Sequence, residues 1–313
     1  MTQLVRHGAL LMTYGSPETL ERDDIASYLS RVRGRREADP ALVDEFTRRY
    51  RLIGGSPLVG ITRRQADALA DAMGWPVEIG MRYSSPSVAT GLRALAVAGA
   101  TRIAGVILSP QYSPLLMGGY ERAIDAAVTA IGDRAPEVAI AGAWHLEPAF
   151  IEAIARRVRR DREALAEEGA GPVHIVMTAH SLPRRVAEQE PGYLDQLRET
   201  AQAVAAAAGL DGADWTLGWQ SAGHEPGEWM TPDFADLMPA IAAGGGRAVL
   251  VVPVQFLADH LEILYDIDVG AREQAERVGL RFARIESLNV DAGLIAALAS
   301  VAGRALGAVP VTS

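Results

Sequence analysis

Cysteine is absent from this chain of 313 residues. Without it the protein has no disulfide, no thiolate zinc site, no cysteine nucleophile and no cysteine-ligated iron–sulfur cluster. Long apolar runs are missing as well. None approaches the roughly 18 uncharged residues of a membrane span, and residues 1–8 lack the apolar core of a signal peptide. These absences predict a cytoplasmic protein with no transmembrane segment.

Basic charge is the scarcer sign, with 30 Lys and Arg against 39 Asp and Glu and a net charge of −9. This balance excludes a general nucleic-acid binder. Hydrophobic residues make up 49% and charged residues 22% of the chain, which is typical of a globular protein. The length exceeds the usual size of a single core, so one large or two mid-sized domains are expected.

Nucleotide-binding motifs are also missing. After the first predicted strand the chain reads Thr13-Tyr14-Gly15-Ser16-Pro17, with no Gly-x-Gly-x-x-Gly, and Pro17 removes an amide that a phosphate would use. No Walker A motif and no Gly-x-Ser-x-Gly elbow occur. The function must therefore be argued from other residues.

What the chain does have is a regular alternation of short apolar runs and helical patterns, which is typical of βαβ units and a parallel sheet. Strands are predicted at Ala9–Thr13, Val77–Met81, Ile103–Leu108, Val138–Ala141, Val173–Thr178, Trp215–Trp219, Ala248–Pro253 and Arg281–Ile285. Helices are predicted at Arg22–Arg33, Gly60–Met73, Ser87–Ala98, Pro148–Glu167, Tyr193–Ala208, Pro232–Ala243 and Ala292–Leu306.

Four strands precede and four follow the polar, glycine-bearing stretch 167–172. The pattern predicts an α/β fold with two similar Rossmann-like halves, each with a four-stranded parallel sheet flanked by helices. We assign residues 1–147 to the N-terminal half and 148–313 to the C-terminal half. Helix Pro148–Glu167 is expected to bridge them, and the last helix can pack back on the first half.

A histidine stands where one buried strand ends. Thr178-Ala179-His180-Ser181-Leu182-Pro183 follows the apolar run Val173–Met177. Open α/β sheets bind ligands at the carboxyl ends of their strands, and histidine accepts protons near neutral pH and ligates metals. The alternative is a histidine that only hydrogen-bonds to the backbone where the loop begins.

Carboxylates follow another apolar strand, in Asp259-His260-Leu261-Glu262-Ile263-Leu264-Tyr265-Asp266. The 3.6-residue period places Glu262, Asp266 and Glu273 on one helical face, with Asp259 one turn before. The alternative is a solvated acidic face. Because the segment directly follows a buried strand, however, its start is expected near the strand ends. Together with His180 it predicts a metal-handling or proton-handling site.

Tyr14 stands at the exit of the first strand, where its phenol could be an oxygen ligand or simply a core or rim side chain. Two nearby segments concentrate seven arginines in this acidic protein: Arg31, Arg33, Arg35, Arg36, Arg48, Arg49 and Arg51. Guanidinium forks suit carboxylates or phosphates, so an anionic small-molecule substrate is predicted, against a solvated face as the alternative.

Trp219-Gln220-Ser221 stands at a further strand end, where the aromatic ring could wall a flat apolar ligand or pack in the core. His224 lies in a loop rich in glycine and proline and is expected to be exposed.

Taken in order, six motifs spread over nearly the whole chain resemble the ferrochelatase family. They are Tyr14-Gly15-Ser16-Pro17, Tyr50 through Ile53-Gly54-Gly55-Ser56-Pro57-Leu58, Leu108-Ser109-Pro110-Gln111-Tyr112-Ser113, Ala179-His180-Ser181-Leu182-Pro183, Trp219-Gln220-Ser221 and Asp259-His260-Leu261-Glu262-Ile263-Leu264-Tyr265. Each motif alone is weak, whereas their joint presence in this order is specific.

The resemblance implies insertion of ferrous iron into a porphyrin held in a cleft between the two halves. It implies that His180 and Glu262 face one side of the macrocycle, where they remove pyrrole protons and guide iron, in roles that stay open between them. A tyrosine at position 14 is similar to coproporphyrin-type enzymes, in which it approaches the metal from the opposite face as an axial ligand. The further implied porphyrin contacts are Arg33, Arg49, Tyr50, Ser56 and Tyr120.

Two departures from the family pattern are visible. The motif Gly54-Gly55-Ser56-Pro57-Leu58 is one residue shorter than Gly-Gly-Ile-Ser-Pro-Leu, and Gly270 stands where relatives carry a third carboxylate on the acidic helix. An outer metal site is then expected only if Glu273 replaces that carboxylate.

The sequence thus predicts a ferrochelatase that inserts Fe²⁺ into coproporphyrin III, giving coproheme in haem biosynthesis. The four propionates of coproporphyrin III fit the arginine cluster better than the two propionates of protoporphyrin. No cofactor beyond substrate Fe²⁺ and no iron–sulfur cluster are expected. We expect a monomer with transient contacts to other haem-pathway enzymes.

Alternatives remain open. One is a protoporphyrin IX ferrochelatase or another tetrapyrrole metal chelatase, including one for cobalt. Another is a non-catalytic haem or porphyrin carrier, which would not need both His180 and Glu262.

Overall fold

Eight apolar runs form eight parallel strands in two four-stranded sheets, as the sequence predicts. The computed structural model of the protein describes residues 5–223 and 227–307. The first sheet has the order β2-β1-β3-β4 and the second β6-β5-β7-β8. The strand bounds are β1 His7–Thr13, β2 Val77–Met81, β3 Arg102–Ile107, β4 Glu137–Ile140, β5 Val173–His180, β6 Trp215–Gln220, β7 Ala248–Pro253 and β8 Arg281–Arg284.

The chain divides into two units, each built on one sheet. Among the described residues, unit 1 contains the chain up to Ser109, Pro114–Trp144 and the residues from Asn289 onward, and unit 2 contains Pro110–Ser113 and His145–Leu288. The border therefore falls three residues before the predicted one. Trp144 is tied to unit 1 because its indole Nε1 donates to the Ile107 carbonyl at 3.2 Å, whereas His145 Nε2 lies 2.8 Å from Glu199 Oε2 in unit 2.

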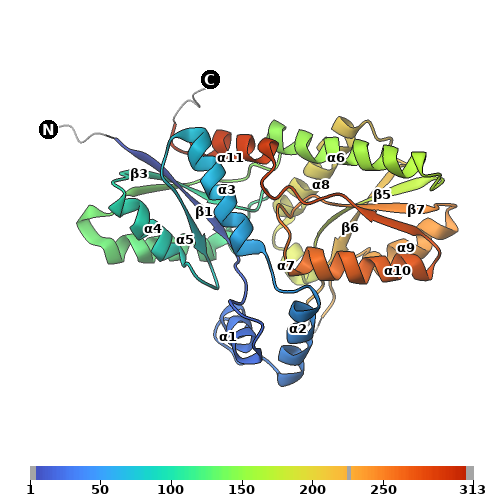
Figure 1. Ribbon diagram of the computed structural model, residues 1–313, viewed down its shortest axis with the longest axis horizontal. Helices are drawn as coiled ribbons and strands as arrows, with labels where there is room; N and C mark the ends of the chain where they lie inside the picture. Colours follow the sequence, from blue (N-terminus) through green and yellow to red (C-terminus); the bar gives the residue numbers. More distant parts are fainter. Residues whose placement is uncertain (1–4, 224–226, 308–313) are drawn as a thin grey trace. The chain divides into compact units, whose positions relative to one another are not determined.

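Unit 1 has helices on both faces of its sheet. Helices α3 and α11 pack together on one face, and α4 and α5 pack together on the other, while α1 and α2 form a separate pair away from the sheet (Figure 1). The bounds are α1 Arg22–Val32, α2 Pro40–Leu52, α3 Leu58–Met73, α4 Val88–Val97, α5 Pro114–Ile131, the short 3₁₀-helix η1 Gly132–Arg134, and α11 Ala292–Ala305. The last helix belongs to unit 1, where Arg102 Nη1 donates to the Leu306 carbonyl at 3.2 Å.

Unit 2 repeats this arrangement with α6 and α8 on one face and α9 and α10 on the other (Figure 1). The bounds are α6 Pro148–Glu167, α7 Arg184–Ala187, α8 Pro191–Ala208, α9 Phe234–Ala243, the π-helix η2 Glu262–Ala271 and α10 Arg272–Arg277.

The predicted bridging role of Pro148–Glu167 is wrong. Helix α6 has the predicted bounds but lies wholly within unit 2, against α8 and strands β5 and β7. Its apolar stripe, which includes Phe150, Ile154 and Val158, is buried there. Burying such a stripe on the sheet is favourable by roughly 25 cal/mol per Å², so the helix forms part of one core.

The strand order fixes where functional side chains can meet. In each sheet two strands lie at the centre, β1 and β3 in the first and β5 and β7 in the second, and the order of the strands reverses between them. Ligands of open α/β sheets bind beyond the carboxyl ends of the strands at such a reversal. Tyr14 follows β1 in unit 1, and His180 ends β5 in unit 2. The two residues thus occupy the same topological position in their respective sheets.

Within residues 5–223 and 227–307, no helix combines the length and the apolar character that crossing a bilayer requires.

Candidate active site

His180 is held at the end of β5 by two hydrogen bonds. Its backbone N–H donates to Gln255 Oε1 at 2.8 Å, and its ring Nδ1 lies 2.5 Å from the Ser181 carbonyl oxygen. A carbonyl can only accept, so Nδ1 must carry the proton in the neutral ring. Nδ1 thus bonds to the backbone, as the alternative interpretation expects, whereas the lone pair of Nε2 remains available for chemistry.

Glu262, the first residue of η2, meets that lone pair. His180 Nε2 lies 3.5 Å from Glu262 Oε2, and each side chain is about one-third exposed, at 32% and 31%. Among the described residues Oε2 is buried and has no hydrogen-bond donor. Leaving a buried acceptor unpaired costs about 1–3 kcal/mol. Two acceptors facing each other can be satisfied by a proton or by a divalent cation, since imidazole and carboxylate both ligate such ions.

Glu262 is placed by an unusual helix. Residues 262–271 form a π-helix, in which hydrogen bonds reach five residues instead of four, a rare form that is frequent at functional sites. Ile263, Ile267 and Ala271 anchor it in the unit 2 core. The predicted single acidic face is therefore wrong, because the 3.6-residue period does not hold over η2.

The other carboxylates of this region have different partners. Asp268 makes a two-pronged ion pair with Arg284 at 2.7 and 2.8 Å, and Asp259 accepts from Ser287 Oγ at 2.7 Å. Glu273 is exposed on α10. Among the described residues no three His, Asp or Glu side chains gather as a metal cluster.

Two glutamines support the pair. Gln255, which fixes the His180 backbone, is itself hydrogen-bonded to the Tyr193 hydroxyl. Gln220 accepts from Thr178 Oγ1 at 2.6 Å, and its amide nitrogen lies 3.5 Å from the Glu262 carbonyl. Gln220 belongs to the strand-end motif 219–221 of the sequence analysis, whereas Gln255 was missed, although the same strand-end rule could have found it after β7.

Tyr14 lies in unit 1 with its side chain 43% exposed. Its ring packs edge to face on Tyr83, with the centroids 4.6 Å apart and the planes at 60°. Its carbonyl accepts from the Tyr83 N–H at 3.0 Å. The predicted strand-exit tyrosine is therefore supported by Tyr83 and partly exposed.

Gly15 makes the turn after Tyr14 possible. Its φ is +94°, and a methyl group added there would overlap Ser84 Oγ. We expect Gly15→Ala to lower the free energy of unfolding by about 1–3 kcal/mol, because both the conformation and the space suit only glycine. Urea denaturation measures this.

The matched control is Gly142→Ala, where a methyl group meets nothing within 4 Å. Equal stability of the two variants would contradict the account of the turn.

The arginine cluster divides into different roles. Arg48 and Arg49 both pair with Glu45, at 2.9 and 2.7 Å, and their hydrogen bonds lower the pKa of Glu45 to about 2. Arg31 Nε donates to the Tyr83 carbonyl at 2.6 Å. Arg33 differs, since its Nε is buried with no hydrogen-bond acceptor among the described residues. It is the arginine best suited to an anionic ligand.

Tyr50 and Ser56 line one pocket of about 330 Å³, together with residues 17–20, 54, 55 and 57. Tyr50 is only 4% exposed, so its ring forms the floor rather than the rim. The shortened Gly54-Gly55-Ser56-Pro57 loop closes one side of this pocket.

Tyr120 is buried beside Arg82. The residue is 4% exposed, its ring centroid lies 5.4 Å from the Arg82 guanidinium carbon, and burial raises the pKa of the phenol. The porphyrin contact predicted for Tyr120 stays a prediction, and Arg82 lies over its ring.

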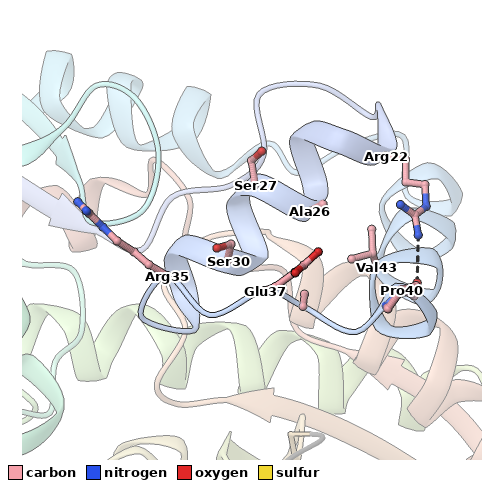
Figure 2. Close-up of a pocket in the computed structure, with 9 residues that line it drawn as sticks. Arg22, Ala26, Ser27, Ser30, Arg35, Glu37, Pro40 and Val43 are labelled. Carbon is pink, nitrogen blue, oxygen red and sulfur yellow. Dashed lines mark hydrogen bonds between the residues drawn. The ribbon is translucent and has the colours of Figure 1, made fainter.

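A second pocket of about 440 Å³ lies at the corner between α1 and α2 (Figure 2). Arg22 stands at one end, where it donates to the Pro40 carbonyl at 3.3 Å, and Arg35 points away from it. None of the predicted porphyrin contacts lines this pocket, although Arg35 of the arginine cluster does. We assign it no role in the site.

Trp219 is 5% exposed and packs in the core of unit 2, so it walls no ligand. His224 lies outside the described residues.

Known proteins resemble this chain over nearly its whole length. The family model described as ferrochelatase matches residues 6–306. A protein from Deinococcus radiodurans called ferrochelatase is 38% identical over 303 residues, which cover 95% of both chains. A protein from Geobacillus kaustophilus called coproporphyrin III ferrochelatase is 33% identical, with 94% of each chain covered.

The fold also has a solved counterpart. The structure of SirB from Bacillus subtilis with Fe³⁺ aligns over 97% of this chain and 98% of its own, with a TM-score of 0.57 at 11% identity. This likeness shows the two-unit α/β fold alone. The family match over nearly all of the chain goes further: the chain belongs to the ferrochelatase family, the metal chelatases of haem biosynthesis that insert iron into a porphyrin.

Proposed function

We propose that this ferrochelatase acts on coproporphyrin III and converts it, with Fe²⁺, into coproheme. The observation that carries the proposal is the facing pair of acceptors, His180 Nε2 and Glu262 Oε2, 3.5 Å apart. Iron enters as a substrate. A chain without cysteine offers no thiolate for a cluster, and the proposal needs no resident cofactor.

Metal insertion requires a base, because the free porphyrin holds two pyrrole N–H protons and releases both as Fe²⁺ enters the ring. The neutral His180 ring has its lone pair at Nε2, since Nδ1 donates to the Ser181 carbonyl. Glu262 supplies the negative charge that attracts Fe²⁺ and can receive a proton in turn. One imidazole and one carboxylate leave the ion's coordination incomplete, so the pair can pass iron on to the ring.

Binding of the porphyrin is assigned to unit 1. Tyr14 is the axial ligand that approaches the metal, and Arg33 offers a buried N–H without a protein acceptor to a propionate. Tyr50 and Ser56 supply polar groups from one pocket. Arg49 contributes less, because Glu45 already neutralises part of its charge. Tyr120 is assigned an indirect role beneath Arg82.

Preference for coproporphyrin over protoporphyrin rests on charge, since four propionates need more cationic partners than two. The presence of Tyr14 supports this subtype by family resemblance. Relatives are called either coproporphyrin III ferrochelatase or ferrochelatase, so only a direct comparison of the two porphyrins decides the subtype.

We expect Arg33→Ala to reduce kcat/KM for coproporphyrin III by about tenfold, the size of one lost charge-assisted hydrogen bond. For protoporphyrin IX the loss should be smaller, because fewer carboxylates compete for cations. Arg49→Ala should show the same bias with a smaller amplitude. The measurement is anaerobic Fe²⁺ insertion with the two porphyrins in parallel.

The control is Arg63→Ala, which removes an arginine paired with Glu78 on the same unit. If the wild-type protein prefers protoporphyrin IX, the proposed coproporphyrin subtype is wrong, whereas iron insertion into a porphyrin still stands. Equal losses on both porphyrins in Arg33→Ala would remove the propionate argument.

A further inference from the structure

Arg82 and Tyr83 directly follow β2 and lie against the chain that follows β1. The Arg82 N–H donates to the Thr13 carbonyl at 2.9 Å, and the Tyr83 N–H donates to the Tyr14 carbonyl at 3.0 Å. The pairing of the two strands thus continues past their ends, and it brings the Tyr83 side chain beside Tyr14.

The side chains continue this contact as a stack. The Tyr83 ring packs edge to face on Tyr14 at 4.6 Å between centroids, and the Arg82 guanidinium carbon lies 4.9 Å from the Tyr83 centroid. The same guanidinium lies 5.4 Å from the buried Tyr120 ring. A cation over an aromatic face is attracted by the ring quadrupole, so Arg82 holds Tyr83 between itself and Tyr14.

Arg82 is itself fixed by helix α5. Its Nη1 donates to the Leu116 carbonyl at 3.3 Å. Gly119 leaves room for the guanidinium, since a methyl group there would overlap it. From α1, Arg31 Nε donates to the Tyr83 carbonyl at 2.6 Å and holds the backbone of the stack.

We propose that Arg82 is a positioning residue that acts through Tyr83 to hold the Tyr14 ring in the orientation that meets the metal of a bound metalloporphyrin. The proposal rests on the function proposed above for Tyr14. Arg82 does not touch the reacting atoms in it. Its part is to limit the number of orientations open to a side chain that is 43% exposed.

Three variants separate this role from general stability. Arg82→Met removes the cation and keeps much of the length. Gly119→Ala leaves Arg82 in the sequence but displaces its guanidinium, and alanine is the better residue inside a helix, so this variant should fold. Arg82→Lys keeps a positive charge over the Tyr83 ring without the planar guanidinium, so it should disturb Tyr14 less than Arg82→Met does. Arg63→Met is the matched control, because Arg63 pairs with Glu78 elsewhere in unit 1.

The first measurement uses the free protein. With ¹³C-labelled tyrosine, the Tyr14 resonance is assigned by its loss in Tyr14→Phe, and its line width and shift report the order of the ring. We expect Arg82→Met and Gly119→Ala to move this resonance toward that of a mobile tyrosine, and Arg63→Met to leave it unchanged. An unchanged Tyr14 resonance in both test variants would overturn the proposal.

The second measurement adds ferric coproporphyrin III and follows the phenolate-to-iron absorption band, which is identified by its loss in Tyr14→Phe. We expect the concentration needed for half-maximal band intensity to rise about three- to tenfold in Arg82→Met and Gly119→Ala, the size of one cation–π contact. Arg82→Lys should recover part of the band. An unchanged titration would overturn the proposal.

The two measurements also distinguish a failure of the proposed function. If wild type and Tyr14→Phe give the same spectrum, Tyr14 is no ligand, and the metal-facing part of the proposal falls with it. The ¹³C resonance would still report whether Arg82 orders the ring.

Discussion

His180→Ala is expected to lower the rate of iron insertion by about 10²–10⁴-fold while leaving porphyrin affinity nearly unchanged. A positioned base typically contributes a factor of this size. The substitution removes Nε2, the imidazole nitrogen that faces Glu262 Oε2. The lost side chain is 32% exposed, and its own hydrogen bond goes to the neighbouring Ser181 carbonyl, so the fold should tolerate the change.

Single-turnover absorbance kinetics measure the rate, and quenching of porphyrin fluorescence on binding measures the affinity. The matched control is His174→Ala, six residues earlier in β5, where the ring bonds only to Thr216 Oγ1 at 2.9 Å. Added imidazole should restore part of the rate in His180→Ala and none in wild type. The role of His180 as a base would be contradicted if His180→Ala bound less porphyrin but inserted iron into the bound porphyrin at the wild-type rate.

Glu262→Gln is expected to reduce insertion by about 10²-fold or more, because it replaces an anionic ligand with a neutral amide of the same shape. The amide NH₂ can donate to His180 Nε2, across the 3.5 Å that now separates two acceptors. The variant therefore both removes the charge that attracts Fe²⁺ and occupies the lone pair of the base. Stability should rise slightly, since the buried orphan acceptor gains a partner.

The matched control for this prediction is Glu273→Gln, an exposed glutamate in α10, which should insert iron at the wild-type rate. Because His180 and Glu262 act as a unit, the double variant should be little slower than the worse single variant. Turnover of Glu262→Gln within a fewfold of wild type would refute the ligand role. Additive losses in the double variant would refute the coupling.

The sequence was sufficient for the sheets, because buried parallel strands read as continuous apolar runs. β2 and β7 have the predicted bounds, and the other six strands differ by at most a few residues at either end. The sequence analysis does not predict helix α2, although Asp39 caps it by accepting from the Ala41 N–H and Pro40 stands at its first position. Its arginines favour an interpretation as ligand contacts over one as a helical face. Helix α5 was missed because Gly118 and Gly119 interrupt its helical pattern.

The π-helix could not be predicted from periodicity. Its apolar residues recur every four positions, at Ile263, Ile267 and Ala271, a spacing that an α-helix also allows. The choice between the two is made by tertiary packing in the unit 2 core. The predicted acidic face is therefore wrong, whereas the expectation that Glu262 lies near the strand ends followed from its place directly after a buried strand.

In unit 1 the sequence predicts which types of residue form the site, but not which side chain lies over another. Tyr120 lies beneath Arg82, and no one-dimensional pattern reports which of two side chains covers the other. Arg82 and Gln255 each lie within two residues of a strand end, the same signal that selected Tyr14 and His180. Applied evenly to every strand, that rule would have found them.

The repeated topology explains how one fold carries two kinds of chemistry. Tyr14 and His180 stand at the same place in sheets of the same strand order, yet the first is a phenol stacked on aromatics and the second an imidazole facing a carboxylate. In the proposed function the strand ends supply rigid positions, and the side chains placed there decide between holding the porphyrin and handling its protons and metal.

The most direct test of this account is anaerobic insertion of Fe²⁺ into coproporphyrin III by the purified protein, followed by the visible absorbance. The account predicts many turnovers per protein molecule, with the free-base bands replaced by those of the iron porphyrin, and no such conversion within the same time for His180→Ala. Tight binding of coproporphyrin III with its free-base spectrum unchanged in the presence of Fe²⁺ would contradict it and identify a carrier.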